Sequence, residues 1–133
     1  MFDGAASGFD NVVLEVVAFQ NVTSLVRVTT ANERSTLDRQ TRKLTSTADL
    51  TITNISNKVI KVPIQAIFLP TVPEVTMPEA SGATTEGKPF YDVGAKAKIV
   101  ELKPNASVTV GVKFVYASTV RFTYTTQVYG VVP

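Results

Sequence analysis

The chain has 133 residues, of which 44% are hydrophobic, and its 13 basic and 11 acidic residues give a net charge of +2. This length is enough to bury one core without disulfides or metals, and so small a net charge argues against a nucleic-acid partner. The chain contains no His and no Cys, which removes the usual general base, the commonest metal ligand and any covalent framework.

The amino-terminal end predicts a short leader ahead of one domain. Residues 1–10 are small and glycine-containing, which is typical of a flexible leader, and the domain is expected over residues 11–133. No basic segment followed by an apolar one begins the chain, so we expect no signal peptide in this form. The longest apolar run, 12–19, is interrupted by Glu15 and is shorter than the roughly 20 residues of a membrane-spanning helix.

The first third of the chain predicts two strands and a loop. Residues 11–19 (NVVLEVVAF) are rich in β-branched side chains and predict a strand. Residues 22–30 predict a second strand, or a continuation of the first through a bulge. Residues 31–46 carry four basic and two acidic side chains with only two large aliphatics, so we expect a polar basic loop. A solvated loop is a better interpretation of this charge than a contact surface.

The middle of the chain has the clearest strand pattern. Apolar side chains alternate with polar ones along 47–53 and again along 60–68. Turn-forming residues occupy 54–58 between them. We therefore expect a β-hairpin with one face on the core.

The last part of the chain predicts several shorter strands. Prolines confine any strand near 74–77 to an edge, and residues 80–89 form a glycine-rich loop followed by short strands at 90–93 and 97–102. Two alternating segments, 107–115 and 119–129, then form a second hairpin-like unit that is expected to be the other wall of the core. The pattern predicts an all-β fold, an immunoglobulin-like antiparallel β-sandwich of about seven to nine strands, with a barrel as the lesser alternative.

No constellation of catalytic or metal-binding residues is visible in the sequence. The acidic residues are scattered over loops and outward strand positions, which suits solubility better than paired-carboxylate catalysis. The Ser and Thr residues have no His to activate them. We expect neither an enzyme nor a cofactor.

The candidate contact residues lie in three segments. Phe90 and Tyr91 form an aromatic pair beside the glycine-rich loop, and alternation predicts that one is buried and the other exposed. The leading strand and the basic loop supply the others, with Tyr116, Arg121 and Tyr129 as weaker candidates. The residues expected to bind a partner are Val12, Leu14, Val16, Phe19, Arg34, Arg39, Phe90 and Tyr91.

From about residue 42 to residue 130, the order of features resembles an immunoglobulin-like or fibronectin-III-like module of bacterial secreted and surface proteins. The matching segments are 48–56 (ADLTITNIS), 63–64, 68–70, 75–76, 80–82, 89–91, 102–110 (LKPNASVTV) and 114–130. Asn105 stands where that family often has Gly, which a left-handed turn position allows. The resemblance implies a spacer, adhesive or assembly unit without shared catalytic residues. A weaker resemblance is to the globular β-sandwich partner subunit of two-chain bacterial pili.

We therefore expect a non-catalytic structural or interaction module of an extracellular bacterial assembly, such as a pilus or filament subunit. Its partner would be a copy of itself or a companion pilin, and its location the cell surface or the medium, after removal of a signal. Two alternatives stay open: a carbohydrate-binding or adhesive module that uses Phe90, Tyr91 and nearby loops, and a virion decoration protein.

Overall fold

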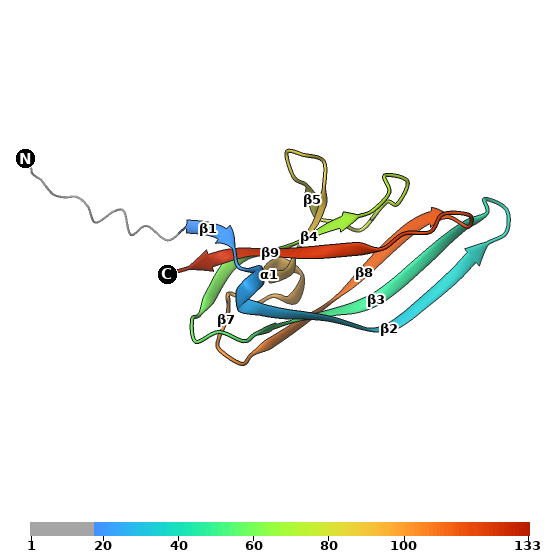
Figure 1. Cartoon of the computed structure of the whole chain (residues 1–133). Coiled ribbons are helices and arrows are strands. Elements are labelled where there is room, and N and C mark those ends of the chain that lie inside the picture. Colours follow the sequence, from blue (N-terminus) through green and yellow to red (C-terminus); the bar gives the residue numbers. More distant parts are fainter. Residues whose placement is uncertain (1–17) are drawn as a thin grey trace, which may run out of the picture.

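The computed structural model describes residues 18–133, which form two antiparallel sheets packed face to face (Figure 1). The larger sheet has six strands in the order β1-β9-β4-β6-β5, with β7 also paired to β4. Its strands are β1 (Ala18–Asn21), β4 (Ile60–Pro70), β5 (Gly82–Ala83), β6 (Pro89–Asp92), β7 (Glu101–Leu102) and β9 (Tyr124–Val132). The smaller sheet has the order β2-β3-β8, with β2 (Val26–Asp38), β3 (Lys43–Asn54) and β8 (Ser107–Ala117).

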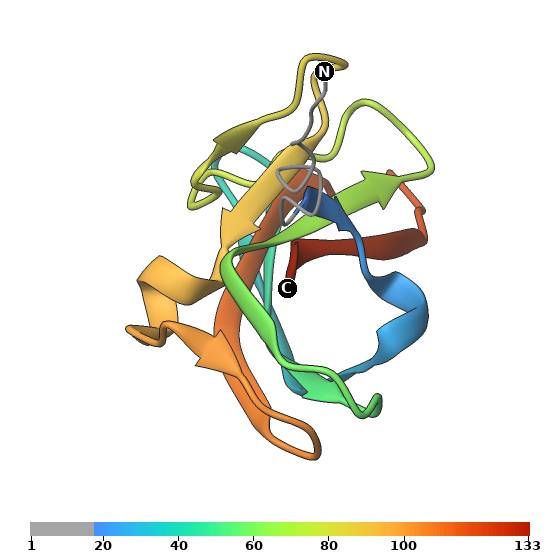
Figure 2. The same cartoon turned by 90° about the vertical axis from the view of Figure 1, so that its left-hand side faces the viewer.

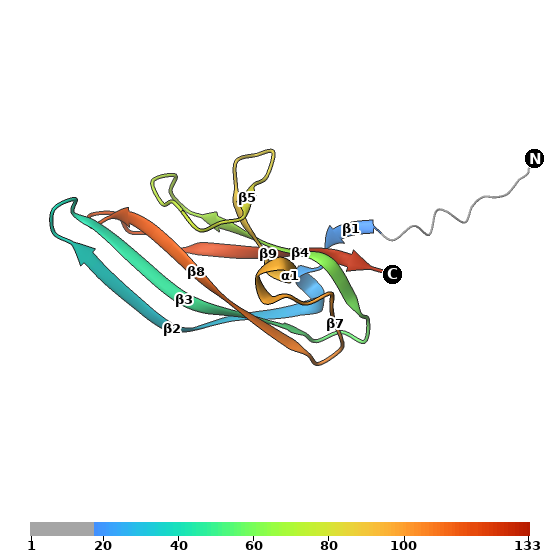
Figure 3. The ribbon, with the colours of Figure 1, turned by 180° about the vertical axis from the view of Figure 1, so that it is seen from behind.

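The predicted all-β sandwich is confirmed, with nine strands in the described part of the chain. Two short helical turns help to close it. The 3-10 turn η2 (Thr23–Leu25) connects β1 to β2 across one side of the sandwich, and α1 (Val93–Ala97) contacts both β4 and β8 on the other side (Figures 2 and 3). The helix α1 was not predicted, and it is capped at its amino end by Asp92, whose carboxylate accepts a hydrogen bond from the Ala95 amide at 3.1 Å.

The core lies between the two sheets and is built by the alternating apolar residues. Leu50, Ile52, Ile64 and Phe68 are fully buried, as the period-two pattern predicted. The ring of Phe68 packs edge-on against Phe114 at a centroid distance of 5.9 Å, so aromatic contacts join the two sheets.

The predicted central hairpin is wrong, because its two strands belong to different sheets. β3 pairs with β8 along its whole length, from Lys43↔Ala117 to Thr53↔Ser107, whereas β4 pairs with β9. The chain crosses from one sheet to the other between Asn54 and Ile60. Each of the two predicted hairpins therefore contributes one strand to each sheet: β3 and β8 lie in the smaller sheet, and β4 and β9 lie in the larger one. Alternation fixes only which face of a strand is buried, and both arrangements bury the same faces.

The predicted polar loop at 31–46 is also wrong. Most of this segment belongs to β2 and β3, which form a long hairpin with pairs as far as Asp38↔Lys43, and the turn at its tip is held by the Asp38 carboxylate. We call the distal part of the β2–β3 hairpin, residues 32–47, the arm. All residues from 31 to 40 are exposed, so the arm forms by strand pairing with little burial. This explains why its sequence lacks an apolar stripe.

The other edge of the smaller sheet carries a remnant of the predicted strand at 74–77. Thr76 forms a single bridge with Val115 of β8, with backbone hydrogen bonds of 2.9 and 2.8 Å in the two directions. The predicted strand at 97–102 is reduced to β7, because its first residue belongs to α1. The turn before β8 is as expected: Asn105 has a φ of 68°, the left-handed conformation.

Candidate binding groove on the outer sheet face

A groove lies on the outer face of the six-stranded sheet, on the side away from the core. It arises because β4 is apolar on both faces over its second half. Ile64, Ala66 and Phe68 point into the core, while Ile67 and Leu69 lie on the opposite face. Ile67 is only 8% exposed although it is on the outer face. Other side chains therefore cover this part of the sheet.

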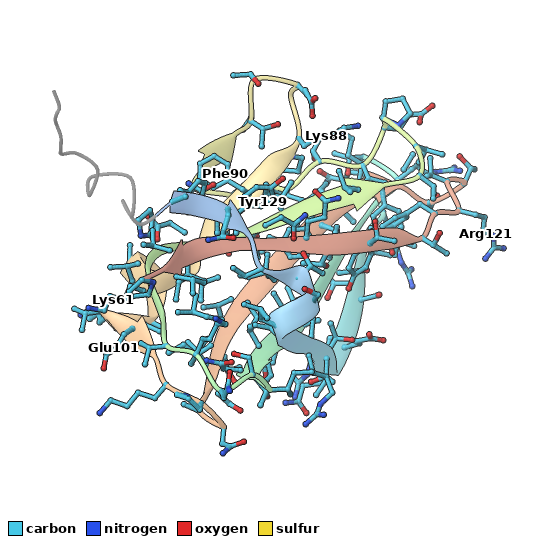
Figure 4. The ribbon with its side chains drawn as sticks, turned by 60° about the vertical axis from the view of Figure 1, so that its left-hand side comes forward. Lys61, Lys88, Phe90, Glu101, Arg121 and Tyr129 are labelled. Carbon is cyan, nitrogen blue, oxygen red and sulfur yellow. The ribbon has the colours of Figure 1, made fainter. Side chains whose placement is uncertain are left out.

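The walls of the groove come from two segments that are far apart in sequence. On one side, Phe19 of β1 packs against Tyr129 of β9 with ring centroids 5.6 Å apart. On the other side, Lys88 of the connection between β5 and β6 and Phe90 of β6 lie beside the sheet strands that form the floor (Figure 4). The enclosed volume is about 360 Å³. We call this site the outer groove, lined by Phe19, Gln65, Ile67, Leu69, Thr84, Thr85, Glu86, Lys88, Phe90, Gln127 and Tyr129.

The chemistry of the outer groove is that of a binding site. Three aromatic side chains and two aliphatic ones supply apolar contact area, which aromatic residues provide at low entropic cost. Gln65 and Gln127 supply amide donors and acceptors, and Lys88 and Glu86 supply one charge of each sign at the rim. Such a set can hold an apolar ring or an extended segment whose polar groups meet the amides.

The structure brings two of the predicted contact residues together in this groove. Phe19 is 44% exposed, and Phe90 is half-buried. They come from opposite walls of the outer groove, although they are 71 positions apart in the sequence. Of the aromatic pair, Phe90 is therefore the accessible member, and its contact with a partner stays a prediction.

Tyr91, the second member of the pair, is a core residue and not a contact residue. It is fully buried, its ring packs edge-on against Phe68 at 5.6 Å, and its hydroxyl accepts a hydrogen bond from the Lys113 amide of β8 at 3.1 Å. Burial raises the pKa of the Tyr91 phenol above its usual value. The prediction that Tyr91 binds a partner is therefore wrong, because none of its surface is accessible.

The other predicted contact residues lie elsewhere. Arg34 and Arg39 are exposed on the arm. Arg121 lies at the same distal end of the molecule, away from Phe90 and Tyr129 (Figure 4). Val12, Leu14 and Val16 fall outside the described residues.

Sequence reasoning missed the floor of the outer groove. Ile67 and Leu69 were not considered, and Tyr129 was only a weak candidate. The signal was present in residues 64–69 (IQAIFL), where apolar side chains occupy both faces of one strand. A strand that is apolar on both faces indicates that something covers each face.

The described residues offer no alternative site of the metal type. Within residues 18–133, no three His, Cys, Asp or Glu side chains gather closely enough to hold a metal ion. In that same part of the chain, no helix is both long and apolar enough to cross a membrane.

Comparison with known proteins found no match: no protein family, no curated protein and no solved structure matches this chain.

Proposed function

We propose that this chain is a non-catalytic structural and interaction module that assembles with copies of itself or with a companion chain. The observation that carries the proposal is the outer groove. An apolar, aromatic-walled depression on the outer face of a sheet is costly to leave in water and is typical of a protein-contact surface. The resemblance to bacterial surface modules suggests an extracellular assembly such as a pilus or filament.

The position of the outer groove supports assembly. One of its walls is β1, an edge strand that pairs only with β9 among the described residues. A neighbouring chain that docked beside β1 could add backbone hydrogen bonds at this edge and at the same time place apolar side chains over Ile67. Phe90 and Tyr129 would then be the central anchors of the contact.

Sedimentation velocity of the full chain over a range of concentrations tests this proposal. We expect wild type to form concentration-dependent oligomers, and Phe90→Ala to weaken association by ten-fold or more, on the order of the loss of one aromatic anchor. Val100→Ala is the matched control, because Val100 is 74% exposed and lies outside the groove. A wild-type chain that stays monomeric at every concentration and with every candidate companion would overturn the proposal.

A second function, carbohydrate binding, is favoured by one specific feature of the groove. Phe19, Tyr129 and Phe90 offer ring faces or edges beside two glutamine amides, a combination that can hold a sugar ring by stacking and hydrogen bonds. Glycan-array screening followed by calorimetry separates this function from assembly. Binding of a sugar that is lost in Tyr129→Ala would favour it, whereas no binding at millimolar sugar would exclude it.

A further inference from the structure

A second site lies where β9 loses its neighbour at the edge of the larger sheet. β1 covers only the carboxyl-terminal part of β9, from Asn21↔Tyr129 to Ala18↔Val132. At Val128 the backbone is still satisfied, because its carbonyl accepts from the Val22 amide at 2.7 Å and its amide donates to the Thr23 hydroxyl at 2.9 Å. The chain then turns away through η2 into β2 (Figure 1).

Beyond this point the edge of β9 is open. Backbone groups of a strand alternate in direction, so Tyr124 and Thr126 direct their N–H and C=O groups to the same side as Val128. Among residues 18–133, no strand pairs with this side of β9 before Tyr129. Two residues of unpaired strand edge therefore face outward, which is the arrangement that accepts an added strand.

An aromatic cleft adjoins this open edge. It encloses about 430 Å³ between β9 and the arm, and the rings of Phe114 and Tyr124 meet in it at a centroid distance of 4.8 Å. Phe122 and Tyr116 extend the apolar wall, with ring centroids 4.8 Å apart. Polar side chains of the arm form the opposite wall, which consists of Glu33, Arg34, Ser35, Ser46 and Thr47. We call the open edge of β9 together with this cleft the seam.

The arm itself is a poorer acceptor than β9, although the outer edge of β2 is also unpaired within the described residues. The register of β2 shifts between Ala31 and Arg34, and Asn32 has a φ of 55°. Such a bulge twists a strand edge away and disrupts the regular spacing of its hydrogen-bonding groups. The edge of β9 has no register shift between Thr125 and Tyr129.

We propose that residues 11–17 of a second copy of this chain add as a strand to the open edge of β9 and place Val12, Leu14 and Val16 in the aromatic cleft. This inference rests on the proposed function and names the segment that makes the contact. Val12, Leu14 and Val16 share one face of such a strand and are all apolar, whereas the other face carries Asn11 and Glu15 together with Val13 and Val17. The face without a polar residue is the one that suits the aromatic cleft.

Charge complementarity supports this occupant. The first seventeen residues contain three of the eleven acidic residues, Asp3, Asp10 and Glu15, and none of the thirteen basic ones. At the end of the molecule that carries the seam, basic side chains outnumber acidic ones: Arg34 and Glu33 both line the cleft, and beyond it Arg39, Arg42, Lys43 and Arg121 are exposed with Asp38. An acidic segment is therefore drawn toward this end of another molecule.

The geometry favours a second copy over the chain's own segment. Ala18 pairs with Val132, at the end of β9 that is opposite to Tyr124. A segment that precedes Ala18 starts at one end of the molecule, and the seam lies toward the other end (Figure 1). A donor at one end and an acceptor at the other give a head-to-tail contact, and repetition of this contact produces an open filament.

Cysteine crosslinking of the full chain tests the proposal, and the natural chain has no Cys to interfere. One variant carries Thr125→Cys, an exposed position on the outer face of the open edge. A second variant carries a donor Cys, placed in turn at residues 12–15. The two variants are mixed and oxidised, so that a disulfide between them reports a contact between two copies. The control acceptor is Val100→Cys, which is 74% exposed.

We expect disulfide-linked dimers in at least ten-fold higher yield for Val13→Cys and Glu15→Cys than for Val12→Cys and Leu14→Cys, because paired residues on the same face have their Cβ atoms about 5 Å apart. Equal yields at all four donors, yields no higher than with the Val100→Cys control, or no dimer would overturn the proposal. So would a chain carrying both Thr125→Cys and Glu15→Cys that closes only on itself.

The proposed function and this inference fail separately. If the full chain assembles but the crosslinks are absent, another surface such as the outer groove makes the contact, and only the inference is wrong. If wild type assembles neither with itself nor with any candidate companion in sedimentation experiments, the proposed function is wrong, whatever the crosslinks show at high concentration.

Discussion

Asn54 is the buried polar residue on which the crossing between the two sheets depends. Its side chain is fully buried. Its amide nitrogen donates to the carbonyls of Lys58 and Leu102 at 2.7 and 2.9 Å, and its oxygen accepts from the amide and hydroxyl of Ser56 at 3.0 and 2.7 Å. The side-chain amide of Asn54 thus donates two hydrogen bonds and accepts two. These bonds hold the corner at which the chain leaves β3 in one sheet and enters β4 in the other.

Asn54→Ala should lower the free energy of unfolding by about 3 kcal/mol, because it leaves the buried Leu102 carbonyl and the Ser56 groups without partners. Urea unfolding followed by circular dichroism measures this. Asn57→Ala in the same exposed turn is the control and should change stability by less than about 0.5 kcal/mol. Equal effects of the two substitutions would show that the corner does not depend on the Asn54 amide.

At the scale of elements, the turn between β7 and β8 shows how one backbone conformation joins two sheets. Asn105 has a φ of 68°, and its amide donates to the Asn54 carbonyl at 2.8 Å. The backbone amide of Asn54 in turn donates to the Ala106 carbonyl at 2.9 Å. The turn therefore aligns the first residue of β8 with the last residues of β3, and the Ser107↔Thr53 pair follows directly.

Asn105→Val should destabilise the chain by about 1–2 kcal/mol, because a β-branched residue is strained in the left-handed region. Asn105→Gly should be neutral within about 0.5 kcal/mol, since Gly adopts this conformation freely. Thermal unfolding of both variants provides the measurement. If Val were tolerated as well as Gly, the turn would have to adopt a different conformation.

The arm is an element whose strands pair with almost no core beneath them. The hydroxyls of Ser35, Ser46 and Tyr116 form a chain of hydrogen bonds across β2, β3 and β8, at 2.8 and 2.7 Å. At its tip, the Ser118 amide donates to the Arg42 carbonyl at 2.9 Å, which ties the β2–β3 turn to the β8–β9 connection. These polar contacts fix the arm to β8 and to the β8–β9 connection, and the arm forms one wall of the cleft.

At the scale of the whole molecule, two phenols link the stability of the sandwich to pH. Burial raises the pKa of Tyr91, and burial together with the charge of Glu33 raises the pKa of Tyr124. Both groups are protonated more firmly in the folded chain than in the unfolded chain, whose tyrosines titrate near 10.0. The stabilisation is therefore complete below pH 10 and is lost as the pH rises through the folded values.

The free energy of unfolding should thus be flat between about pH 7 and pH 9 and should fall above about pH 10. Urea titrations across this range measure the effect. Lysine side chains also lose their charge above about pH 10. Tyr124→Phe separates the two effects, because it removes one of the two phenols and leaves the ring and every lysine in place. Its slope above pH 10 should be shallower than that of wild type, and an identical slope would contradict this assignment.

The sequence alone predicted the class of fold and the buried face of the four long alternating strands, β3, β4, β8 and β9. Leu50, Ile52, Val110 and Val128 are buried as their alternation predicted, because burial follows directly from the two-residue period of a strand. The left-handed turn at Asn105 was equally local. Such features depend on each residue and its near neighbours.

The pairing of the strands, and with it the surfaces that are left open, became visible only in the folded molecule. Alternation specifies which face of a strand is buried and not which strand lies beside it, so it could not show that β3 pairs with β8 while β4 pairs with β9. For the same reason it could not bring Phe19 to Tyr129 and Phe90, or reveal that β1 ends before Tyr124 and leaves the edge of β9 uncovered. Strand pairing is settled by contacts between residues far apart in the chain, and the candidate sites are by-products of that pairing.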